Sequence, residues 1–235
     1  MPSLRNAFET PQAKRQYVRT LFATIADRYD LITSLLSYGQ DARWKRKLVA
    51  LAEVRRGERA LDLASGTGDI AFAVAARGGK AVGLDITHRM LQLARAKSDS
   101  APFVTGDMAA LPFASGSFDL VTTGYGLRNV PDLQTAIDEI ARVLKPGGRM
   151  LSLDFNKPQN AIVRGVYLIY LTAVGALLGW VLHGDPDTYR YIPASIRQYP
   201  GAEAVAQMFE ARGFTGVRCY PVLGGLMTIH HATRT

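Results

Sequence analysis

The stretch Ala60-Leu61-Asp62-Leu63-Ala64-Ser65-Gly66-Thr67-Gly68-Asp69 decides the fold of this 235-residue chain. A short apolar run contains the acidic Asp62, a glycine turn follows, and a helical pattern then covers residues 70–77. This order predicts a strand, a loop and a helix, which form the first unit of a nucleotide-type α/β sheet. Gly66 and Gly68 allow the backbone to turn sharply and to approach a ligand closely. Because Asp62 lies near the strand end, its carboxylate is expected to meet a positive group, which suits a ligand carrying both an amino acid and a nucleoside.

The glycine turn alone leaves two ligand classes open. Residues 66–71 also fit the looser dinucleotide fingerprint glycine-x-glycine-x-x-alanine, and lone motifs of this kind produce false matches. The next apolar run, residues 81–84, ends in Asp85, whose carboxylate can accept hydrogen bonds from both ribose hydroxyls. After a third run, Asp107 can accept a hydrogen bond from an exocyclic amine, and Met108 can pack on an adenine face.

Two further strands complete this series. An apolar strand over residues 118–123 is followed by a helix that ends near Lys145-Pro146-Gly147-Gly148, and then by a strand over residues 150–153. The series of acids, together with the Lys-Pro-Gly-Gly turn, resembles the S-adenosylmethionine-dependent methyltransferases. It therefore favours S-adenosylmethionine over NAD as the cofactor.

We expect one domain over residues 1–235, because the chain can bury an ample core and shows no repeat or low-complexity tract. Strands alternating with helices over roughly residues 58–155 predict a mainly parallel sheet with right-handed crossovers. The expected parts are a helical cap (1–57, broken near 37–39, with residues 1–15 poorly ordered), a cofactor-binding core (58–158), a helical insertion (159–200), and a C-terminal helix with two strands (201–235).

The net charge of +8 is concentrated near the N-terminus. Residues 1–60 hold twelve Lys and Arg against six Asp and Glu, and they include the run Arg43-Trp44-Lys45-Arg46-Lys47. Nucleic acid, an anionic membrane surface, or an ordinary solvated helix face would each account for such a patch. The single cysteine excludes an internal disulfide, the four histidines lack metal spacing, and residues 1–20 lack the apolar run of a secretory signal. We expect no metal site.

The insertion contains an eighteen-residue stretch, Gly165 to Leu182, without a charged side chain. Its length makes it a borderline candidate for a transmembrane helix. The stretch is not expected to span a membrane, because the sheet needs the segments on both sides of it. Its three glycines and two tyrosines suit a pair of helices packed over a site. We expect an apolar lid for a lipophilic substrate, with membrane contact at its rim; an ordinary buried helix is the alternative.

Four stretches resemble the ubiquinone/menaquinone biosynthesis C-methyltransferases, and together they cover nearly the whole chain from residue 17 onward. They are Tyr29-Asp30-Leu31 with Ser37-Tyr38-Gly39 and Trp44-Lys45; Gly126-Leu127-Arg128-Asn129-Val130; Arg142 to Gly148 running on to Asp154-Phe155-Asn156-Lys157-Pro158; and Asp187-Thr188-Tyr189-Arg190-Tyr191-Ile192-Pro193 with Ser195-Ile196. The chain departs from the family at Ile32-Thr33, usually Met-Asn, and at Asp41-Ala42, usually His-Arg. Two further departures lie outside the cap: Asp154, usually Glu, which is a mild change, and Gly124, usually a small residue such as Ser. The cap is thus matched less well than the cofactor half, which bears on which quinone is used more than on the reaction.

The resemblance implies a fold and an activity. The fold is α/β, a Rossmann-like class I methyltransferase sheet, mainly parallel with a C-terminal antiparallel hairpin, with an N-terminal helical cap and a helical lid insertion. The activity is methyl transfer from S-adenosylmethionine to a ring carbon of a polyprenylated quinol. We therefore expect a cytoplasmic enzyme that associates peripherally with an anionic membrane surface. Its expected partner is a lipophilic quinol, nucleic acid is not expected to bind, and a homodimer is left open.

The resemblance and the strand ends together nominate the site residues. Arg128 would stabilise phenolate-like charge on the substrate, although a structural ion pair is its alternative role, and Asn129 would orient a hydroxyl. The proton acceptor is left open among Asp30, His183 and an ordered water. The cofactor-binding residues are Asp62, Ser65, Gly66, Thr67, Gly68, Asp85, Asp107, Met108 and Gly124, and the substrate-binding residues are Tyr29, Asp30, Tyr189 and Tyr191.

Other functions share parts of this pattern. An amine-directed DNA methyltransferase would commonly show Asn or Asp followed by Pro-Pro and an aromatic residue after the fourth strand, where this chain has Gly124-Tyr125-Gly126-Leu127. A protein that binds S-adenosylmethionine without catalysis is disfavoured by Arg128-Asn129 beside the cofactor motifs. A phospholipid N-methyltransferase, or another small-molecule methyltransferase, is the strongest alternative, because it shares the membrane logic.

Overall fold

The computed structural model describes residue 4 and residues 6–235. A seven-stranded sheet forms its centre, with the strands in the order β3-β2-β1-β4-β5-β7-β6. The five strands β1 to β5 run parallel, whereas β7 pairs antiparallel with both β5 and β6. The expected mainly parallel sheet with a C-terminal antiparallel hairpin is therefore confirmed. The strands are β1 (Arg59–Leu63), β2 (Lys80–Asp85), β3 (Phe103–Thr105), β4 (Phe118–Gly124), β5 (Leu144–Phe155), β6 (Phe214–Val222) and β7 (Met227–Arg234).

Helices cover both faces of the sheet, which explains why its central strands read as nearly continuous apolar runs. One face is packed by α3 (Asp41–Leu51), α4 (Asp69–Ala75) and α5 (His88–Lys97), and the other by α6 (Leu133–Val143) and α9 (Ala202–Glu210). Ile137, Ile140 and Phe209 are fully buried on the second face, as are Leu48 and Leu91 on the first.

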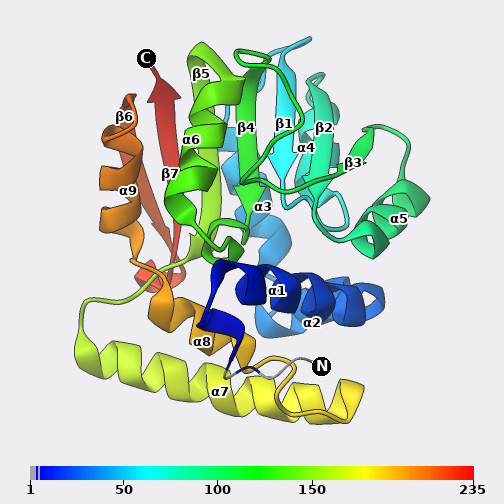
Figure 1. Cartoon of the computed structure of the whole chain (residues 1–235), viewed down its shortest axis with the longest axis vertical. Helices are drawn as coiled ribbons and strands as arrows, with labels where there is room; N and C mark the ends of the chain where they lie inside the picture. The colour runs from blue at the N-terminus through cyan, green and yellow to red at the C-terminus, as the bar shows by residue number, and fades with distance from the viewer. Residues whose placement is uncertain (1–3, 5) are drawn as a thin grey trace.

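The remaining helices gather at the carboxyl ends of the parallel strands, below the sheet in Figure 1. They are α1 (Pro11–Ile25), α2 (Tyr29–Leu36), α7 (Ala161–His183) and α8 (Tyr191–Gln198), with short 3₁₀ turns at η1 (Asn6–Phe8), η2 (Ala26–Arg28), η3 (Leu127–Asn129) and η4 (Leu223–Gly225). Helix α7 lies farthest from the sheet, beyond α1, α2 and α8 (Figure 1). Ligands of open α/β sheets bind at this end of the strands, so the cap and the insertion cover the expected site.

The start of the chain is more ordered than we predicted. Residues 11–15 belong to α1, where Thr10 accepts a hydrogen bond from the Ala13 amide at 3.1 Å and Pro11 occupies the first helical turn. Both features favour a helix start. Residues 1–3 and 5 lie outside the described residues, so the prediction for them is untested.

The insertion contains two helices, α7 and α8, but the uncharged stretch is not divided between them. The whole uncharged stretch belongs to one 23-residue helix, α7. Its glycines do not break it, because Gly175 and Gly179 lie on the buried face where other backbone comes close. A Cβ at Gly179 would lie 2.5 Å from the Asp185 carbonyl oxygen, and one at Gly175 would lie 3.2 Å from that of Tyr189. The glycines therefore mark close packing of the helix on the segment that follows it.

Candidate functional site

The glycine loop between β1 and α4 is held by the acid that ends β2. The Gly66 amide donates to Asp85 Oδ2 at 2.9 Å, and the Thr87 amide donates to Asp85 Oδ1 at 2.8 Å. Gly66 and Gly68 adopt φ of +54° and +91°, in the left-handed region that favours glycine. Burial raises the pKa of Asp85, although the two amide hydrogen bonds oppose this effect. Asp85 therefore both shapes the loop and presents an acceptor at its rim.

A small pocket, called the strand-end pocket below, lies at this edge of the sheet. Of the predicted cofactor-binding residues, the structure brings together Gly66, Asp85, Asp107, Met108 and Gly124 in its wall. Asn129 lies in the same wall, which places it beside the predicted cofactor-binding residues instead of in the larger cavity described below. Its side-chain amide donates to the Tyr125 carbonyl at 2.8 Å, and its Oδ1 is buried with no partner among the described residues.

The cap narrows this pocket. Arg15 of α1 forms an ion pair with Asp107, with 2.8 Å between Nε and Oδ2, and both residues line the pocket. The free volume is about 80 Å³, whereas small-molecule sites usually offer about 300–1,000 Å³. A nucleoside-sized ligand therefore enters only after Arg15 releases Asp107 or α1 moves outward.

The other predicted cofactor-binding residues support the pocket from behind and are absent from its wall. Asp62 is buried and accepts from Thr122 Oγ1 at 2.8 Å, while its second oxygen has no partner among the described residues. Burial raises the pKa of Asp62 to about 7. Ser65 Oγ is buried without a partner in the described chain, Thr67 donates to Asp30, and Gly68 begins α4, where a Cβ would lie 2.7 Å from the Phe72 ring.

A much larger and mainly apolar cavity of about 890 Å³ lies beneath the cap and α7. The residues that line this cavity include Arg128 and three tyrosines that the resemblance nominated for substrate binding, Tyr29, Tyr189 and Tyr191. Tyr29 lines both this cavity and the strand-end pocket, and a Cβ at Gly66 would lie 3.8 Å from the Tyr29 ring. The two spaces therefore meet at Tyr29, next to the glycine loop.

Arg128 forms the structural ion pair that the sequence left open and also lines the large cavity. It is 6% exposed, and its Nη1 donates to Asp154 Oδ1 at 2.9 Å and to the Tyr125 carbonyl at 3.0 Å. Its Cζ lies 4.6 Å from the centre of the Phe155 ring. Burial is the largest single influence and lowers the pKa of Arg128, but Asp154 together with Tyr191 and Tyr29 raises the pKa above its ordinary value. Its Nε has no hydrogen-bond partner in the described part of the chain, so the fixed cation keeps capacity to bind a ligand.

The sequence analysis named Tyr191 but missed two other polar side chains of the large cavity, Tyr167 and Thr188, and it missed Lys14. The hydroxyls of Tyr167, Thr188 and Tyr191 are buried, belong to residues that line the large cavity, and have no partner among residues 6–235. Thr188 falls within the quoted Tyr-Arg-Tyr stretch, but nothing in that stretch says that its hydroxyl is unpaired. Lys14 donates to the Arg128 carbonyl at 3.1 Å, and burial together with the Arg128 charge lowers the pKa of Lys14 to about 8.

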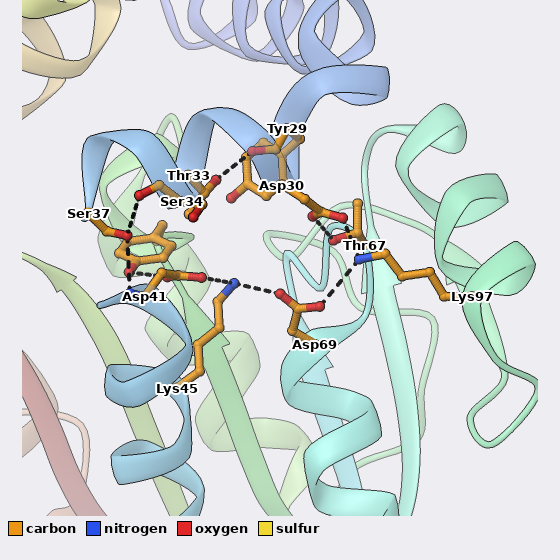
Figure 2. Close-up of polar contacts among 11 residues, drawn as sticks. Tyr29, Asp30, Thr33, Ser34, Ser37, Asp41, Lys45, Thr67, Asp69 and Lys97 are labelled. Carbon is orange, nitrogen blue, oxygen red and sulfur yellow. Dashed lines mark hydrogen bonds and ion pairs between the residues drawn. The ribbon is translucent and has the colours of Figure 1, made fainter. Parts of the chain in front are cut away.

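Asp30 and His183, nominated as proton acceptors, lie outside the lining of the large cavity. Figure 2 shows that Asp30 belongs to a network of charges that joins the cap to the glycine loop. It accepts from Thr67 at 2.7 Å and pairs with Lys97 at 2.6 Å. His183 instead lies 2.8 Å from the Tyr189 hydroxyl, and burial lowers the pKa of His183. The structure therefore places Asp30 in this network and outside the lining of the large cavity.

The same network continues through Lys45 (Figure 2). Its ammonium lies 2.6 Å from Asp41 and 2.9 Å from Asp69, and Asp41 accepts from the Tyr125 hydroxyl at 2.6 Å. Two cap helices are thus tied to the start of α4 and to the loop after β4. Within the described residues, no group of three or more His, Cys, Asp or Glu side chains could hold a metal ion.

The strand order, the glycine loop and the acid at the end of β2 define a class I methyltransferase, the class that uses S-adenosylmethionine. A family model described as the ubiE/COQ5 methyltransferase family matches residues 10–234. The chain belongs to this family.

Two relatives show how far the similarity extends. The demethylmenaquinone methyltransferase of Thermus thermophilus is 41% identical over 220 residues, covering 91% of this chain and 100% of that protein. The ubiquinone/menaquinone biosynthesis C-methyltransferase UbiE of Teredinibacter turnerae is 37% identical over 97% of this chain and 96% of its own length.

Solved structures agree on the fold. A SAM-dependent methyltransferase of Thermotoga maritima superposes with a TM-score of 0.67 at 16% identity, covering 93% of this chain and 100% of that one. Phosphoethanolamine N-methyltransferase 2 of Haemonchus contortus, solved with S-adenosyl-L-methionine, superposes at 0.60 and 15% identity over 82% of this chain and 52% of its own.

The strand-end pocket suits S-adenosylmethionine in the groups that line it. Asp85 offers a carboxylate for ribose hydroxyls and Met108 offers an apolar surface for adenine, while the Gly66 amide holds Asp85 in place. The wall is also too tight for side chains at its glycines, since a Cβ at Gly126 would lie 2.4 Å from Thr123 Oγ1. The enzyme is an S-adenosylmethionine-dependent methyltransferase, and these residues would hold its cofactor.

Proposed function

We propose that this enzyme methylates a ring carbon of a polyprenylated quinol in respiratory quinone biosynthesis, either demethylmenaquinol or a 2-polyprenyl-6-methoxy-1,4-benzoquinol. The observation that carries the proposal is the apolar cavity of about 890 Å³ that meets the cofactor pocket at Tyr29 and contains a buried Arg128. The names of the relatives from Thermus and Teredinibacter point to the same substrates.

The charges in the cavity favour a phenol over an amine as the acceptor. Arg43, Lys47 and Arg128 line the cavity, whereas no Asp or Glu does so among the described residues. A quinol that loses a proton gains negative charge, which these cations would stabilise. A phospholipid amine carries positive charge and would be repelled. This is the feature that separates the proposal from phospholipid N-methylation.

The chemistry asks little of the protein beyond alignment and charge stabilisation. When bound, S-adenosylmethionine supplies a methyl group that is already electrophilic. The ring carbon would form a C–C bond to this methyl group as a ring hydroxyl gives up its proton, and the S–CH3 bond would break with S-adenosylhomocysteine as the leaving group. The hydrogen on the methylated carbon would then leave as a proton while the ring oxygen is reprotonated, so aromaticity would return with a net loss of one proton. Arg128 lies where it would stabilise the oxyanion, and the hydroxyls of Thr188 and Tyr191 would fix the ring oxygens by hydrogen bonds.

The cavity also accounts for the use of a lipid-soluble substrate. Ligand pockets of about 300–1,000 Å³ enclose a body of drug size, so the cavity would hold the ring and the first part of a tail, and the rest would stay outside. A cytoplasmic enzyme that meets its substrate at a membrane surface, by peripheral association, fits this need. Nucleic acid plays no part in the proposal.

The test offers the enzyme two acceptors in parallel. Purified enzyme is incubated with methyl-labelled S-adenosylmethionine and either a demethylated quinol extract, kept reduced, or a phospholipid extract. We expect label in the quinol fraction only. Label in the phospholipid fraction would contradict the proposal. If the quinol fraction is labelled, a comparison of kcat/KM for naphthoquinols and benzoquinols would identify the ring.

A further inference from the structure

The exposed large apolar side chains of this protein gather at one end of the molecule. Eleven such residues occur in the described chain, and all of them lie in the cap, in α7 or in η4. Seven belong to α7 alone, and none lies on a helix that covers a sheet face. Apolar surface concentrated in this way marks an interaction site, whereas scattered residues would need no explanation.

On α7 these residues form one continuous row. Ile162, Val166, Ile169, Ala173, Leu177 and Trp180 follow one another at spacings of three or four and are all exposed. Such spacings place side chains on one face of a helix. Ile162 is 78% exposed, Ile169 71% and Trp180 65%. The only charged side chain between Ala161 and Leu182 is Arg164, so the row is apolar over nearly the whole helix, about 35 Å at 1.5 Å per residue.

The opposite face of α7 is committed to the enzyme. Tyr167, Leu171, Gly175 and Gly179 are buried, and the first two line the large cavity. Helix α7 is long and apolar enough to cross a membrane by length and composition, with 28% of its most apolar window buried. Crossing a membrane would remove Tyr167 and Leu171 from the cavity. The helix therefore has one face for the substrate cavity and one apolar face left for a partner.

The charge distribution identifies the kind of partner. Residues 11–51 hold eight Lys and Arg against three Asp, and residues 157–200 hold four against two, so these two segments carry +7 of the net +8. Arg43, Arg46 and Lys47 of α3 are exposed and form no ion pair within the described chain. Arg28 of the cap donates to the Leu182 carbonyl at the end of α7, so cap and helix are in contact. An apolar row beside a basic surface is complementary to the headgroups and acyl chains of an anionic bilayer.

We propose that α7 lies flat in the surface of an anionic bilayer, with the row from Ile162 to Trp180 immersed and the cavity on its other side facing the enzyme. This inference rests on the proposed function, because a quinol substrate would then pass from the bilayer into the cavity without crossing water. Trp180 would lie at the headgroup level, where the indole ring keeps both polar and apolar contacts. The occupant of the row is lipid, and a second copy of the chain is what the test must separate from it.

Flotation with vesicles that contain no quinol tests the surface independently of the reaction. We expect wild-type enzyme to float with phosphatidylglycerol/phosphatidylethanolamine vesicles at low salt, to float less at high salt, and to retain a residual bound fraction. The variant Ile169→Gln/Leu177→Gln/Trp180→Gln keeps good helix formers and removes apolar side chains, so vesicle partitioning should fall at least tenfold. The variant Arg43→Gln/Arg46→Gln/Lys47→Gln should behave at low salt as the wild type does at high salt.

Matched controls separate this effect from general damage. Two variants add the same negative charge at different places. Ile169→Glu/Leu177→Glu places the charge in the row of α7 and should remove most of the binding. Gln134→Glu/Gln207→Glu places it at exposed positions of α6 and α9, on a sheet face, and should remove little. Melting temperatures identify any variant that fails to fold. For such a case, a Trp44→Phe protein keeps Trp180 as its one tryptophan, and quenching of its fluorescence by lipids brominated along their acyl chains reports immersion without any substitution at the row.

Four results would overturn the inference. The first is wild-type enzyme that stays unbound with anionic vesicles at low salt, and the second is α7 variants that float as well as the wild type. The third is release of the bound enzyme by detergent alone, which would mean that α7 spans the bilayer. The fourth is a change from dimer to monomer in the α7 variants, which would make the row a subunit interface. A failed substrate proposal looks different, because wild type would then float and yet methylate no quinol. If both proposals hold, the α7 variants keep their turnover of a tail-less quinol in solution and lose at least tenfold with a long-tailed quinol in vesicles.

Discussion

The two neighbouring spaces of this enzyme are built by different means. The strand-end pocket is walled largely by residues at the carboxyl ends of the parallel strands, among them Asp85, which ends β2, and Asp107, which follows β3, while Arg15 of α1 closes one side. The large cavity takes much of its wall from α1, α2, α3, α7 and α8, and it takes Arg128 and Phe155 from the strand ends. A shared sheet edge can therefore bind one cofactor throughout a family, while the cap and the insertion decide which substrate meets it. Substitutions on the two sides of this division should have separable effects on cofactor affinity and on turnover.

The largest effect should come from Arg128, which belongs to the substrate cavity. Arg128→Gln removes a fixed cation from a buried site, so kcat should fall about 10²–10³-fold. It also leaves Asp154 buried without its partner, so the free energy of unfolding should fall by about 3–5 kcal/mol. The affinity for S-adenosylmethionine, measured by calorimetry, should change little.

Two companion variants separate the roles of Arg128. Arg128→Gln/Asp154→Asn removes both charges and should recover most of the stability without recovering turnover. Arg128→Lys should keep cofactor affinity and lose turnover, because an ammonium lacks the planar fork of a guanidinium. If turnover returned with stability in the double variant, the residue would be structural.

The next effect concerns Asp62, which lies behind the cofactor pocket and has no counterpart around the cavity. The pKa of Asp62 in the folded state, about 7, lies above the ordinary value of 3.8. Between pH 3.8 and pH 7 the folded state therefore binds more protons than the unfolded state does. The stability that protonated Asp62 contributes is present below about pH 4 and is lost as the pH rises to about 7. With about 1.4 kcal/mol for each pKa unit, the loss is about 4 kcal/mol.

Asp62→Asn should remove this dependence. Denaturant midpoints are measured for both proteins from pH 4 to 8, and the difference between the two curves should change across that interval. Parallel curves would show that the carboxyl of Asp62 is already ionised at low pH, against this account.

Asp85 should matter to the cofactor pocket alone. Asp85→Ala removes two charge-assisted hydrogen bonds to the ligand, so affinity for S-adenosylmethionine should weaken by about 2–4 kcal/mol. The variant also frees the Gly66 and Thr87 amides, so it should melt at a lower temperature. Calorimetry at a temperature where the variant is folded gives the dissociation constant, and an unchanged value would remove Asp85 from the cofactor site.

The smallest effect should come from Arg15, which closes the cofactor pocket by its ion pair with Asp107. The pair is partly exposed, and such pairs contribute about 0–1 kcal/mol. Arg15→Ala should therefore tighten binding of S-adenosylmethionine by up to about fivefold, seen as a lower dissociation constant in titration. Weaker binding would mean that Arg15 contacts the cofactor and does not compete with it.

The sequence predicted the sheet and much of the cofactor pocket because both depend on local order. The runs before Asp85 and Asp107 fix strands, and parallel strands bring those residues to one edge. It failed where long-range packing decides. Gly175 and Gly179 suggested a break in the insertion, yet they serve close packing inside one helix. Asp30 matched a substrate motif, yet its carboxylate joins Thr67 and Lys97. No local pattern shows that Lys14 lies beside Arg128, 114 residues away.

Methylation of carbon rather than oxygen is the central claim, and product chemistry tests it directly. The purified enzyme is given ¹³C-methyl S-adenosylmethionine and a demethylated quinol, and the product is oxidised and analysed by mass spectrometry and NMR. The account predicts a quinone that retains the labelled methyl group on a ring carbon. An O-methyl ether, which cannot be oxidised to the quinone while it keeps that methyl group, would contradict it.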